Sequence, residues 1–297
     1  MRSPHHRITT SIKECDMADK PLEGKVAIVT GAGSPIGMGR SMSVALAQAG
    51  AKVLMMDIDE QTLAESANYV REMAGDDSVQ TIIGDTSDAT SAEAIVQAAL
   101  SELGGLHILI NCAGTNPRNV GEEGAPQAPF WELTTRAWER VLAVNTSGPF
   151  HMARAAVPHM LEQKWGRVIG VTTSLDTMIR GSMAPYGPSK AGHEALVSVM
   201  AHDLEGTGVT ANVLVPGGPV NTNLLPPDTA FDREKLIQPS IMMTPVVWLS
   251  SDESADVTGQ RFIAYNWDDS LPVKERLEKA GAPAAWPQLG GKAVRPA

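Results

Sequence analysis

Tyr186 and Lys190 lie four residues apart in the segment YGPSK. At this spacing on a helix the two side chains share one face. A free tyrosine has a pKa of ~10 and is a poor base at neutral pH, but a nearby ammonium favours the phenolate. The pair therefore predicts proton transfer by a phenol that the lysine tunes. A tyrosine ring packed under a lysine stem has the same spacing, so the prediction needs other residues.

Three hydroxyl side chains precede this pair, at Thr172, Thr173 and Ser174, where an apolar run ends. A substrate carbonyl can lie between such hydroxyls and the phenol. Upstream, Asn145 lies within the predicted helix WERVLAVNTSGPF. A buried amide there needs hydrogen-bond partners, and a helix kink with local side-chain bonding is the alternative explanation. Together these residues form a candidate catalytic cluster.

A glycine-rich turn, TGAGSPIGMGR at residues 30–40, joins the apolar run KVAIV to a predicted helix. Its glycines are Gly31, Gly33, Gly37 and Gly39, and Pro35 lies between them. Such a turn presents backbone N–H groups and the positive end of a helix to a pyrophosphate. Glycines are also common in plain loops, so the turn alone is a modest signal for nucleotide binding.

Asp57 closes the second apolar run, KVLMMD, 26 residues after Gly31. This is about the offset at which an acid bonds both ribose hydroxyls of NAD. The carboxylate would repel the 2′-phosphate of NADP, and no Arg or Lys lies between Gly31 and Gly39. The sequence therefore predicts NAD, with NADP as the weaker candidate. Alternatively Asp57 caps the helix after it, a role that Asp59 can take equally well.

The elements that must position these residues alternate along the chain. Predicted strands lie at 25–30, 52–57, 79–84, 106–111, 166–173, 209–216 and 261–265, and predicted helices at 38–49, 60–74, 90–103, 132–162, 184–205 and 243–251. This alternation predicts an α/β fold, a Rossmann-like doubly wound seven-stranded parallel sheet in three α/β/α layers. Its ligand crevice lies beyond the carboxyl ends of the strands, where GDTSD (84–88) and NCAG (111–114) also end strands.

Composition bounds the function classes. The chain has 297 residues, a net charge of −10 and 43% hydrophobic residues, which predicts one globular domain at 21–266 and no nucleic-acid partner. Its two cysteines predict neither a disulfide framework nor a metal site. No apolar run reaches the roughly 18 residues of a membrane span, so we expect a cytoplasmic protein. Residues 1–20 are expected to be a flexible extension, and 267–297 a C-terminal arm.

Six motifs occur in an order and spacing that resemble one known family. They are TG at 30–31, NCAG at 111–114, Asn145, the hydroxyl cluster, YGPSK at 186–190 and PGGPVNT at 216–222. Across about residues 21–266 the chain resembles the short-chain dehydrogenase/reductase superfamily in its classical form. The resemblance implies NAD(P)-dependent interconversion of a secondary alcohol and a ketone. It also implies a small-molecule substrate and a homodimer or homotetramer formed through the helices at 132–162 and 184–205.

The resemblance implies a role for each catalytic residue. Tyr186 exchanges a proton with the substrate oxygen, and Lys190 binds the nicotinamide ribose and lowers the pKa of the tyrosine. Asn145 holds a water in the proton relay. Ungapped counting gives the serine position of the family to Thr173, whereas a loop shorter by one residue brings Ser174 there. Both are candidates for the substrate-binding hydroxyl, and side-chain type favours Ser174.

Cofactor contacts also carry over. Asp57 resembles the ribose-binding acid and Asp85 the adenine contact. Gly37 and Gly39 match the second and third family glycines, which puts Pro35 in an inserted tip. The segment PGGPVNT is one residue longer than usual before its valine. The implied cofactor-binding residues are Gly31, Gly33, Ser34, Gly37, Met38, Asp57, Ile58, Asp85, Thr86, Asn111, Ala113, Gly114, Tyr186, Lys190, Pro216, Gly217, Val220 and Thr222.

Substrate identity is expected to depend on two loops, the segment after 111 and the lid that begins at LLPPDTAF. Arg118, Arg180 or Arg233 would pair with a substrate anion, although solvated loop arginines are commoner. Two other functions fit the same motifs. One is reduction of a C=C or C=N bond, and the other is dinucleotide sensing without a reaction.

Overall fold

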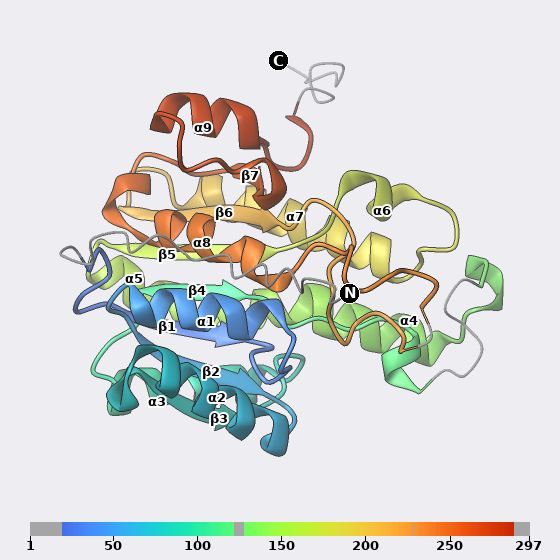
Figure 1. The fold of residues 1–297 in the computed structure, drawn as a ribbon, viewed down its shortest axis with the longest axis horizontal. Helices are drawn as coiled ribbons and strands as arrows, with labels where there is room; N and C mark the ends of the chain where they lie inside the picture. The colour runs from blue at the N-terminus through green and yellow to red at the C-terminus, as the bar shows by residue number, and fades with distance from the viewer. Residues whose placement is uncertain (1–19, 122–127, 228, 288–297) are drawn as a thin grey trace, which may run out of the picture.

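The computed structural model describes residues 20–121, 128–227 and 229–287. Its centre is one sheet in the order β3-β2-β1-β4-β5-β6-β7-β8 (Figure 1). The strands are β1 Val26–Thr30, β2 Lys52–Asp57, β3 Val79–Ile83, β4 Ile108–Asn111, β5 Gly166–Val171, β6 Val209–Val215, β7 Gln260–Ile263 and β8 Gly281–Pro283. Pairs from β3 to β7 are parallel, and β8 pairs antiparallel with β7.

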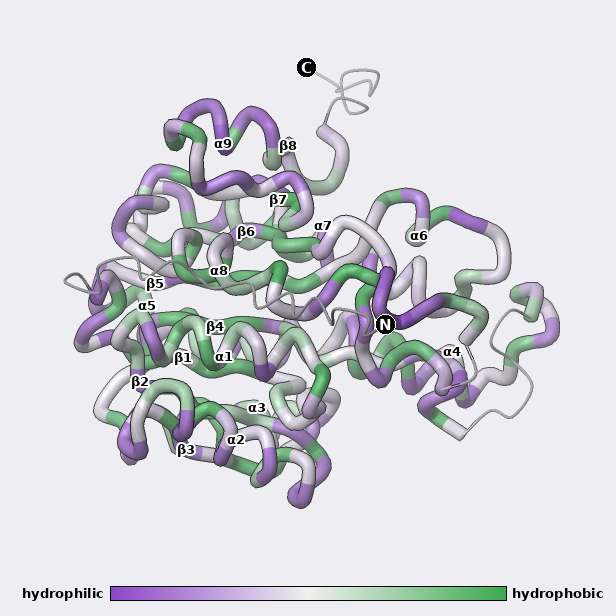
Figure 2. Tube along the Cα trace, viewed as in Figure 1, coloured by the Kyte–Doolittle hydropathy of each residue, from purple (hydrophilic) through white to green (hydrophobic). Residues whose placement is uncertain are grey.

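Helices cover both faces of the sheet. On one face α1 (Met38–Gln48), α2 (Glu60–Ala74) and α8 (Met243–Ser250) pack in one apolar core; on the other, α3 (Ala89–Glu102), α5 (Gly148–Glu162) and α7 (Tyr186–Asp203) pack in a second. Strands β1, β4, β5 and β6 are buried along their whole length, as expected for parallel strands covered on both sides. Figure 2 shows hydrophobic residues along the central strands. The predicted fold class is confirmed.

The predicted helix at 132–162 is two helices with an irregular turn between them. It consists of α4 (Thr135–Leu142), a π-helical segment at Ala143–Ser147 and α5. Widened turns of this kind are frequent at functional sites. Asn145 lies in the widened turn, and Pro149, which has no backbone N–H to donate, occupies the first turn of α5. The structure has a π-helical turn at Asn145, and the Asn145 side chain bonds Thr115 and Ser189 rather than its own helix turn.

The sheet has one strand more than predicted. After α9 (Val273–Ala280), the chain returns to the outer edge of β7, where Arg261 pairs with Ala282. The three residues of β8 are Gly, Ala and Pro, which lack the β-branched pattern of a strand. Only pairing with β7 makes this segment a strand. A further short helix, α6 (Leu175–Ile179), follows β5 where a loop was expected.

The strand order reverses between β1 and β4, and crevices for ligands form at such a switch point. The turns after β1, β2, β3, β4 and β5 all lie at this edge. Among the described residues no helix is long and apolar enough to cross a membrane, and no His, Cys, Asp and Glu group could hold a metal. Most of the predicted extension, and residues 288–297 of the predicted arm, lie outside the described residues.

Candidate active site

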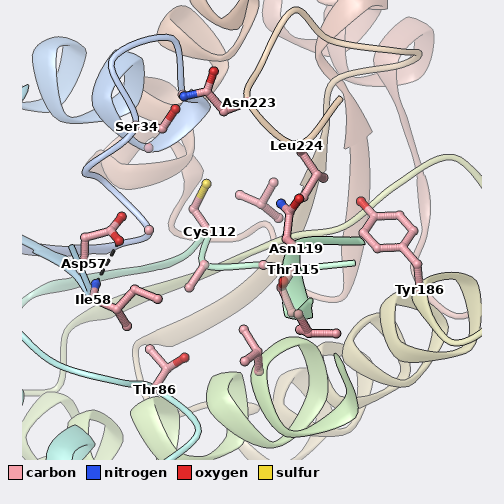
Figure 3. Close-up of a pocket in the computed structure, with 18 of the residues that line it drawn as sticks. Ser34, Asp57, Ile58, Thr86, Cys112, Thr115, Asn119, Tyr186, Asn223 and Leu224 are labelled. Atoms are coloured by element: carbon pink, nitrogen blue, oxygen red, sulfur yellow. Dashed lines mark hydrogen bonds between the residues drawn. The ribbon is translucent and has the colours of Figure 1, made fainter. Parts of the chain in front are cut away.

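A cleft of about 790 Å³ opens at the carboxyl edge of the sheet. Its walls come from the turns after β1 to β5, from α4 and α7, and from the segment 222–224 (Figure 3). The predicted residues that line it are Gly31, Ser34, Gly37, Met38, Asp57, Ile58, Asp85, Thr86, Ala113, Gly114, Tyr186, Lys190 and Thr222. The structure therefore brings most of the predicted cofactor residues to one cavity.

The glycines of the turn after β1 allow close backbone approaches. Gly31 has a φ of 68°, and a Cβ there would lie 2.7 Å from the Cα of Ala113. A Cβ on Gly33 would lie 2.8 Å from the Cγ of Asp57. Larger residues at these positions would push the turn away from β4 and from Asp57. The glycines thus pack the turn against the two neighbouring strand ends.

Pro35 occupies a tight turn in front of α1. The N–H of Gly37 donates to the carbonyl of Ser34 (2.8 Å), so Pro35 is the second residue of a four-residue turn, a position that its fixed φ favours. Within the described chain, no side chain caps the α1 N-terminus, and the buried Oγ of Ser34 has no hydrogen-bond partner. An uncapped helix end beside an unpaired hydroxyl fits a pyrophosphate. The proline therefore does not obstruct the N-terminus of α1.

Asp57 joins the end of β2 to the glycine turn. Its Oδ2 accepts from the N–H of Gly33 (2.8 Å), and its Oδ1 accepts from the N–H of Ile58 (2.8 Å; Figure 3). The cap of α2 is instead Asp59, whose Oδ1 accepts from the N–H of Thr62 (2.8 Å). Asp57 is therefore not the helix cap, and its carboxylate lines the cleft.

Asp85 is already hydrogen-bonded within the protein. Its Oδ2 accepts from the guanidinium of Arg140 (2.8 Å), and its Oδ1 accepts from the N–H and hydroxyl of Ser87. Burial raises the pKa of Asp85, but the bonds from Ser87 and Arg140 outweigh it and keep the pKa below its ordinary value. Asp85 lines the cleft while it ties the β3 turn to α4. The sequence offered no signal for Arg140 as its partner.

Tyr186 and Lys190 lie in the first turns of α7. The Lys190 side chain is buried, its Nζ donates to the carbonyl of Val171 (2.8 Å), and burial lowers its pKa to about 8. The Tyr186 ring points into the cleft (Figure 3). Burial raises the pKa of Tyr186 to about 12, and a hydrogen bond with the Thr173 side chain lowers it in part. In this structure burial thus opposes the lowering expected from Lys190.

The two candidate hydroxyls have different surroundings. The Thr173 side chain acts on the phenol of Tyr186 and lowers its pKa. Ser174 is the N-cap of α6, where its Oγ accepts from the N–H of Thr177 (3.4 Å) and lies 2.8 Å from the Thr177 hydroxyl. The ungapped count that favours Thr173 agrees with this geometry, whereas α6, which was not predicted, uses the Ser174 hydroxyl.

Asn145 is fully buried behind the cleft. Its Nδ2 donates to the carbonyl of Thr115 (2.9 Å) and to the Oγ of Ser189 (2.9 Å), while its Oδ1 accepts from the N–H of Thr115 (2.8 Å). The Ser189 hydroxyl donates to the carbonyl of Tyr186 (2.7 Å). Asn145 therefore joins the turn after β4 to the helix that carries the tyrosine.

Gly114 separates the cleft from this polar group. A Cβ at Gly114 would lie 3.4 Å from the Nζ of Lys190 and 3.5 Å from the Oδ1 of Asn145. A Cβ would thus be in ordinary van der Waals contact with both groups, so Gly114 lies directly between the cleft and the ammonium and amide behind it.

Several predicted residues lie beside the cleft rather than on its wall. Gly33, Asn111, Asn145, Thr173, Ser174, Pro216, Gly217 and Val220 do not line it. Asn111 is buried, and its Nδ2 has no partner among the described residues. Val220 is buried and forms a bridge with Ile237. The segment PGGPVNT, which is one residue longer than usual before Val220, thus forms a bridge at this valine. Thr222, two residues later, lines the cleft.

Sequence reasoning missed part of the wall. Cys112, Thr115, Asn119, Val120, Asn223 and Leu224 line the cleft. The Asn116 side chain donates to the carbonyl of Leu224 (3.0 Å), which joins the turn after β4 to the segment after β6. Position beside NCAG and PGGPVNT was the signal that could have found these residues.

The candidate arginines for a substrate anion have protein partners. The Arg233 guanidinium donates to Oδ1 of Asn221 (2.8 Å) and to the carbonyls of Leu225 and Pro226. It therefore holds the lid together rather than facing a substrate. Arg180 pairs with Asp176 on the surface (3.4 Å).

Comparisons with known proteins agree with this site. The short chain dehydrogenase family model matches residues 25–231. An uncharacterized oxidoreductase of Mycobacterium tuberculosis is 30% identical over 277 residues, which cover 82% of this chain and 95% of the relative. A 3-oxoacyl-[acyl-carrier-protein] reductase of Vibrio cholerae is 29% identical over 248 residues, 80% of this chain and 95% of the relative.

The fold is also similar to that of solved structures. A Shigella flexneri protein described as a short chain dehydrogenase, in complex with NADP, superposes with a TM-score of 0.74 at 24% identity, covering 83% of this chain and 99% of that one. The family model spans more than half of the chain. The chain therefore belongs to the short-chain dehydrogenase/reductase superfamily of nicotinamide-dependent oxidoreductases.

Proposed function

We propose that this oxidoreductase interconverts a secondary alcohol and a ketone with NAD as cofactor, and that Tyr186 is its general acid and base. The observation that carries the proposal is the phenol of Tyr186, which points into the cleft, with the Thr173 side chain acting on it to lower its pKa. A phenol and a second hydroxyl at one point can hold a carbonyl or alcohol oxygen between them. When bound, the nicotinamide accepts or supplies the hydride.

Each residue of the cluster then has a task. Tyr186 gives a proton to the ketone oxygen during reduction and takes it back during oxidation. Thr173 orients that oxygen by a second hydrogen bond. Lys190, held by the carbonyl of Val171, keeps a cation beside the phenol and stabilises its anion. Asn145 fixes the turn after β4 against α7 and so keeps these groups in register.

The cofactor preference rests on Asp57. Its carboxylate lines the cleft at the end of β2 and is fixed by the Gly33 N–H. Arg40, the first cation after the glycine turn, lies over the Tyr69 ring, with its guanidinium carbon 4.3 Å from the ring centroid. A carboxylate favours two ribose hydroxyls and disfavours a phosphate. Ser34 and the α1 N-terminus would hold the pyrophosphate.

Assembly and location stay predictions. A homodimer or homotetramer is supported by apolar side chains exposed on three helices: Trp138 on α4, Phe150 and Leu161 on α5, and Val199 on α7. Light scattering on the purified chain measures the mass of the assembly. A cytoplasmic location is not tested by the structure.

The test is a panel of secondary alcohols with NAD and of ketones with NADH, followed by absorbance of the reduced nicotinamide. Tyr186→Phe keeps the ring and removes the proton. Because general acid–base catalysis contributes about 10²- to 10⁴-fold, we expect turnover to fall by that factor. Cofactor affinity, measured by calorimetry, should change less than about threefold, which is under 1 kcal/mol.

Two results would contradict the proposal. Equal turnover by Tyr186→Phe would remove the proton-transfer role. Cofactor binding without turnover of any alcohol or ketone would favour either dinucleotide sensing or reduction of a C=C or C=N bond, which a panel of enones and imines distinguishes.

A further inference from the structure

Glu194 is a fully buried carboxylate one helical turn after Lys190 on α7. Three other elements donate hydrogen bonds to it. The donors are Nε of Arg261 on β7 (3.0 Å), the hydroxyl of Thr172 after β5 (2.9 Å) and the N–H of Ala285 after β8 (3.4 Å). A single acid thus joins the catalytic helix to the end of β5 and to the C-terminal segment.

Arg261 makes a second contact at the same strand end. Its Nη2 donates to the backbone carbonyl of Thr173 (2.7 Å). The side chain of this same threonine acts on the phenol of Tyr186 and lowers its pKa. Arg261 therefore holds the backbone of a residue whose side chain acts on the phenol.

Stability is a weak explanation for this ion pair. Desolvation of two buried charges costs several kcal/mol per ion, and well-packed apolar residues of similar volume are often equally stable. The ion pair instead fixes the orientation of the Arg261 guanidinium. The planar guanidinium donates in two fixed directions, to Glu194 and to Thr173, and cannot rotate one bond without breaking the other.

We propose that Glu194 and Arg261 are positioning residues, which hold Thr173 against Tyr186 and connect this contact to the segment after β8 through Ala285. The inference rests on the proposed function, in which Thr173 orients the substrate oxygen. It adds a specific claim: Arg261 acts on turnover only through Thr173.

Strand β5, which Thr173 follows, provides a matched control. Arg167, at the amino end of β5, is also buried and also donates to carbonyls, those of Gly166 (2.9 Å), Gly208 (3.3 Å) and Ser251 (3.2 Å). It lies at the opposite edge of the sheet from the cleft. Arg167→Met removes a comparable set of buried hydrogen bonds without touching Thr173.

The test is a double-mutant cycle on Arg261→Met and Thr173→Ala, with Arg167→Met as control. We expect Arg261→Met to lower kcat at least tenfold, with KM and NAD affinity changed less than threefold. In the Thr173→Ala background, Arg261→Met should lower kcat less than twofold further, because the threonine it acts through is gone. Arg167→Met should lower the melting temperature and leave kcat within twofold.

Multiplicative losses in the double variant would overturn the inference, as would an equal loss of kcat in Arg167→Met. If Arg261→Met does not fold, the cycle uses Arg261→Lys, which keeps the charge but cannot make both bonds, and Glu194→Gln, which keeps an acceptor. A crystal structure of Arg261→Lys reports the contact between Thr173 and Tyr186 independently of turnover. A contact that is retained there overturns the inference, and an inactive wild type refutes only the proposed function.

Discussion

The two ends of the parallel strands use polar residues in different ways. At the amino edge most of the groups are paired, and the buried Oγ of Ser250 is the exception among the described residues. Nδ1 of His107 accepts from the N–H of Val26 (3.0 Å), and Nε2 of Gln163 donates to the carbonyl of Leu106 (2.8 Å). At the carboxyl edge, by contrast, Ser34 has a buried hydroxyl without a partner in the described chain, and α1 begins without a side-chain cap.

The buried cations at the two edges differ in the same way. The buried Arg167 at the amino edge donates to three carbonyls of neighbouring loops. The buried Lys190 at the carboxyl edge makes one hydrogen bond, to Val171, and its pKa is lowered by burial. Polar burial alone therefore does not indicate a site, and neither does a single unpaired hydroxyl such as that of Ser250. An unpaired hydroxyl beside an uncapped helix end that faces a cleft does.

The largest effect in this contrast is expected for Lys190→Met. Loss of the ammonium beside the phenol should reduce turnover by about 100-fold, within the range of general acid–base effects. The same change should stabilise the fold by about 3 kcal/mol at pH 7, because it removes a buried charge whose pKa is lowered from 10.5 to about 8. Thermal melts and turnover assays of the wild type and the variant measure both.

The pH dependence of this gain has a definite sign. The pKa of Lys190 falls from 10.5 to about 8 on folding, so burial of the charged form costs stability below pH 8. That cost declines as the pH rises from 8 to 10.5 and is absent above it. The difference in unfolding free energy between Lys190→Met and the wild type should fall to zero over this range. A difference that is constant with pH would mean that packing, not charge, stabilises the variant.

A smaller effect is expected for Asp57→Ala at the carboxyl edge. Without the carboxylate, the site should lose affinity for NAD and no longer repel a 2′-phosphate. We expect the ratio of kcat/KM for NAD over NADP to fall by about tenfold, or 1.4 kcal/mol. Asp59→Ala is the matched control, because Asp59 caps α2 and does not line the cleft. An unchanged ratio in Asp57→Ala would show that the ribose is recognised elsewhere.

The smallest effect is expected at the amino edge, for His107→Asn. Burial, and then the charge of Lys25, lowers the pKa of His107 below 6.5. The stability that depends on neutral His107 is therefore complete above pH 6.5 and is lost as the pH falls below it. Asn keeps an acceptor for the Val26 N–H and does not titrate, so its melting temperature should decline less between pH 7 and pH 5. Turnover at pH 7 should be the same for both proteins.

The sequence predicted the elements that local pattern determines. Alternating apolar runs and helical periods predicted seven of the strands within a few residues. Parallel strands that helices cover on both faces appear in the sequence as apolar runs, and the helices between them have their own period. The cleft residues followed from motifs at strand ends, since parallel strands bring their carboxyl ends to one edge. The β8 strand and the π-helical turn at Asn145 depend on tertiary partners and have no local pattern.

Site details were lost for the same reason. The choice between Thr173 and Ser174 depends on α6, whose N-cap uses Ser174. Asp85 and Arg140 are 55 residues apart, and Glu194 and Arg261 are 67 apart, so neither pair has a signal in one sequence. Side-chain type showed that these residues are charged, but only the fold shows which charge each one meets.

The pairing of β8 has a consequence for self-association of the folded chain. An unpaired outer strand offers N–H and carbonyl groups to any other extended chain, which makes sheet edges sites of aggregation. Here the backbone of β7 is bonded along Gln260–Phe262 to a segment of the same chain. That segment is three residues long and ends at Pro283, which has no N–H to offer. The sheet thus ends on the side of β7 in a short strand with a terminal proline, a form of edge that discourages pairing with another chain, and β3 is the edge strand at the opposite end of the strand order.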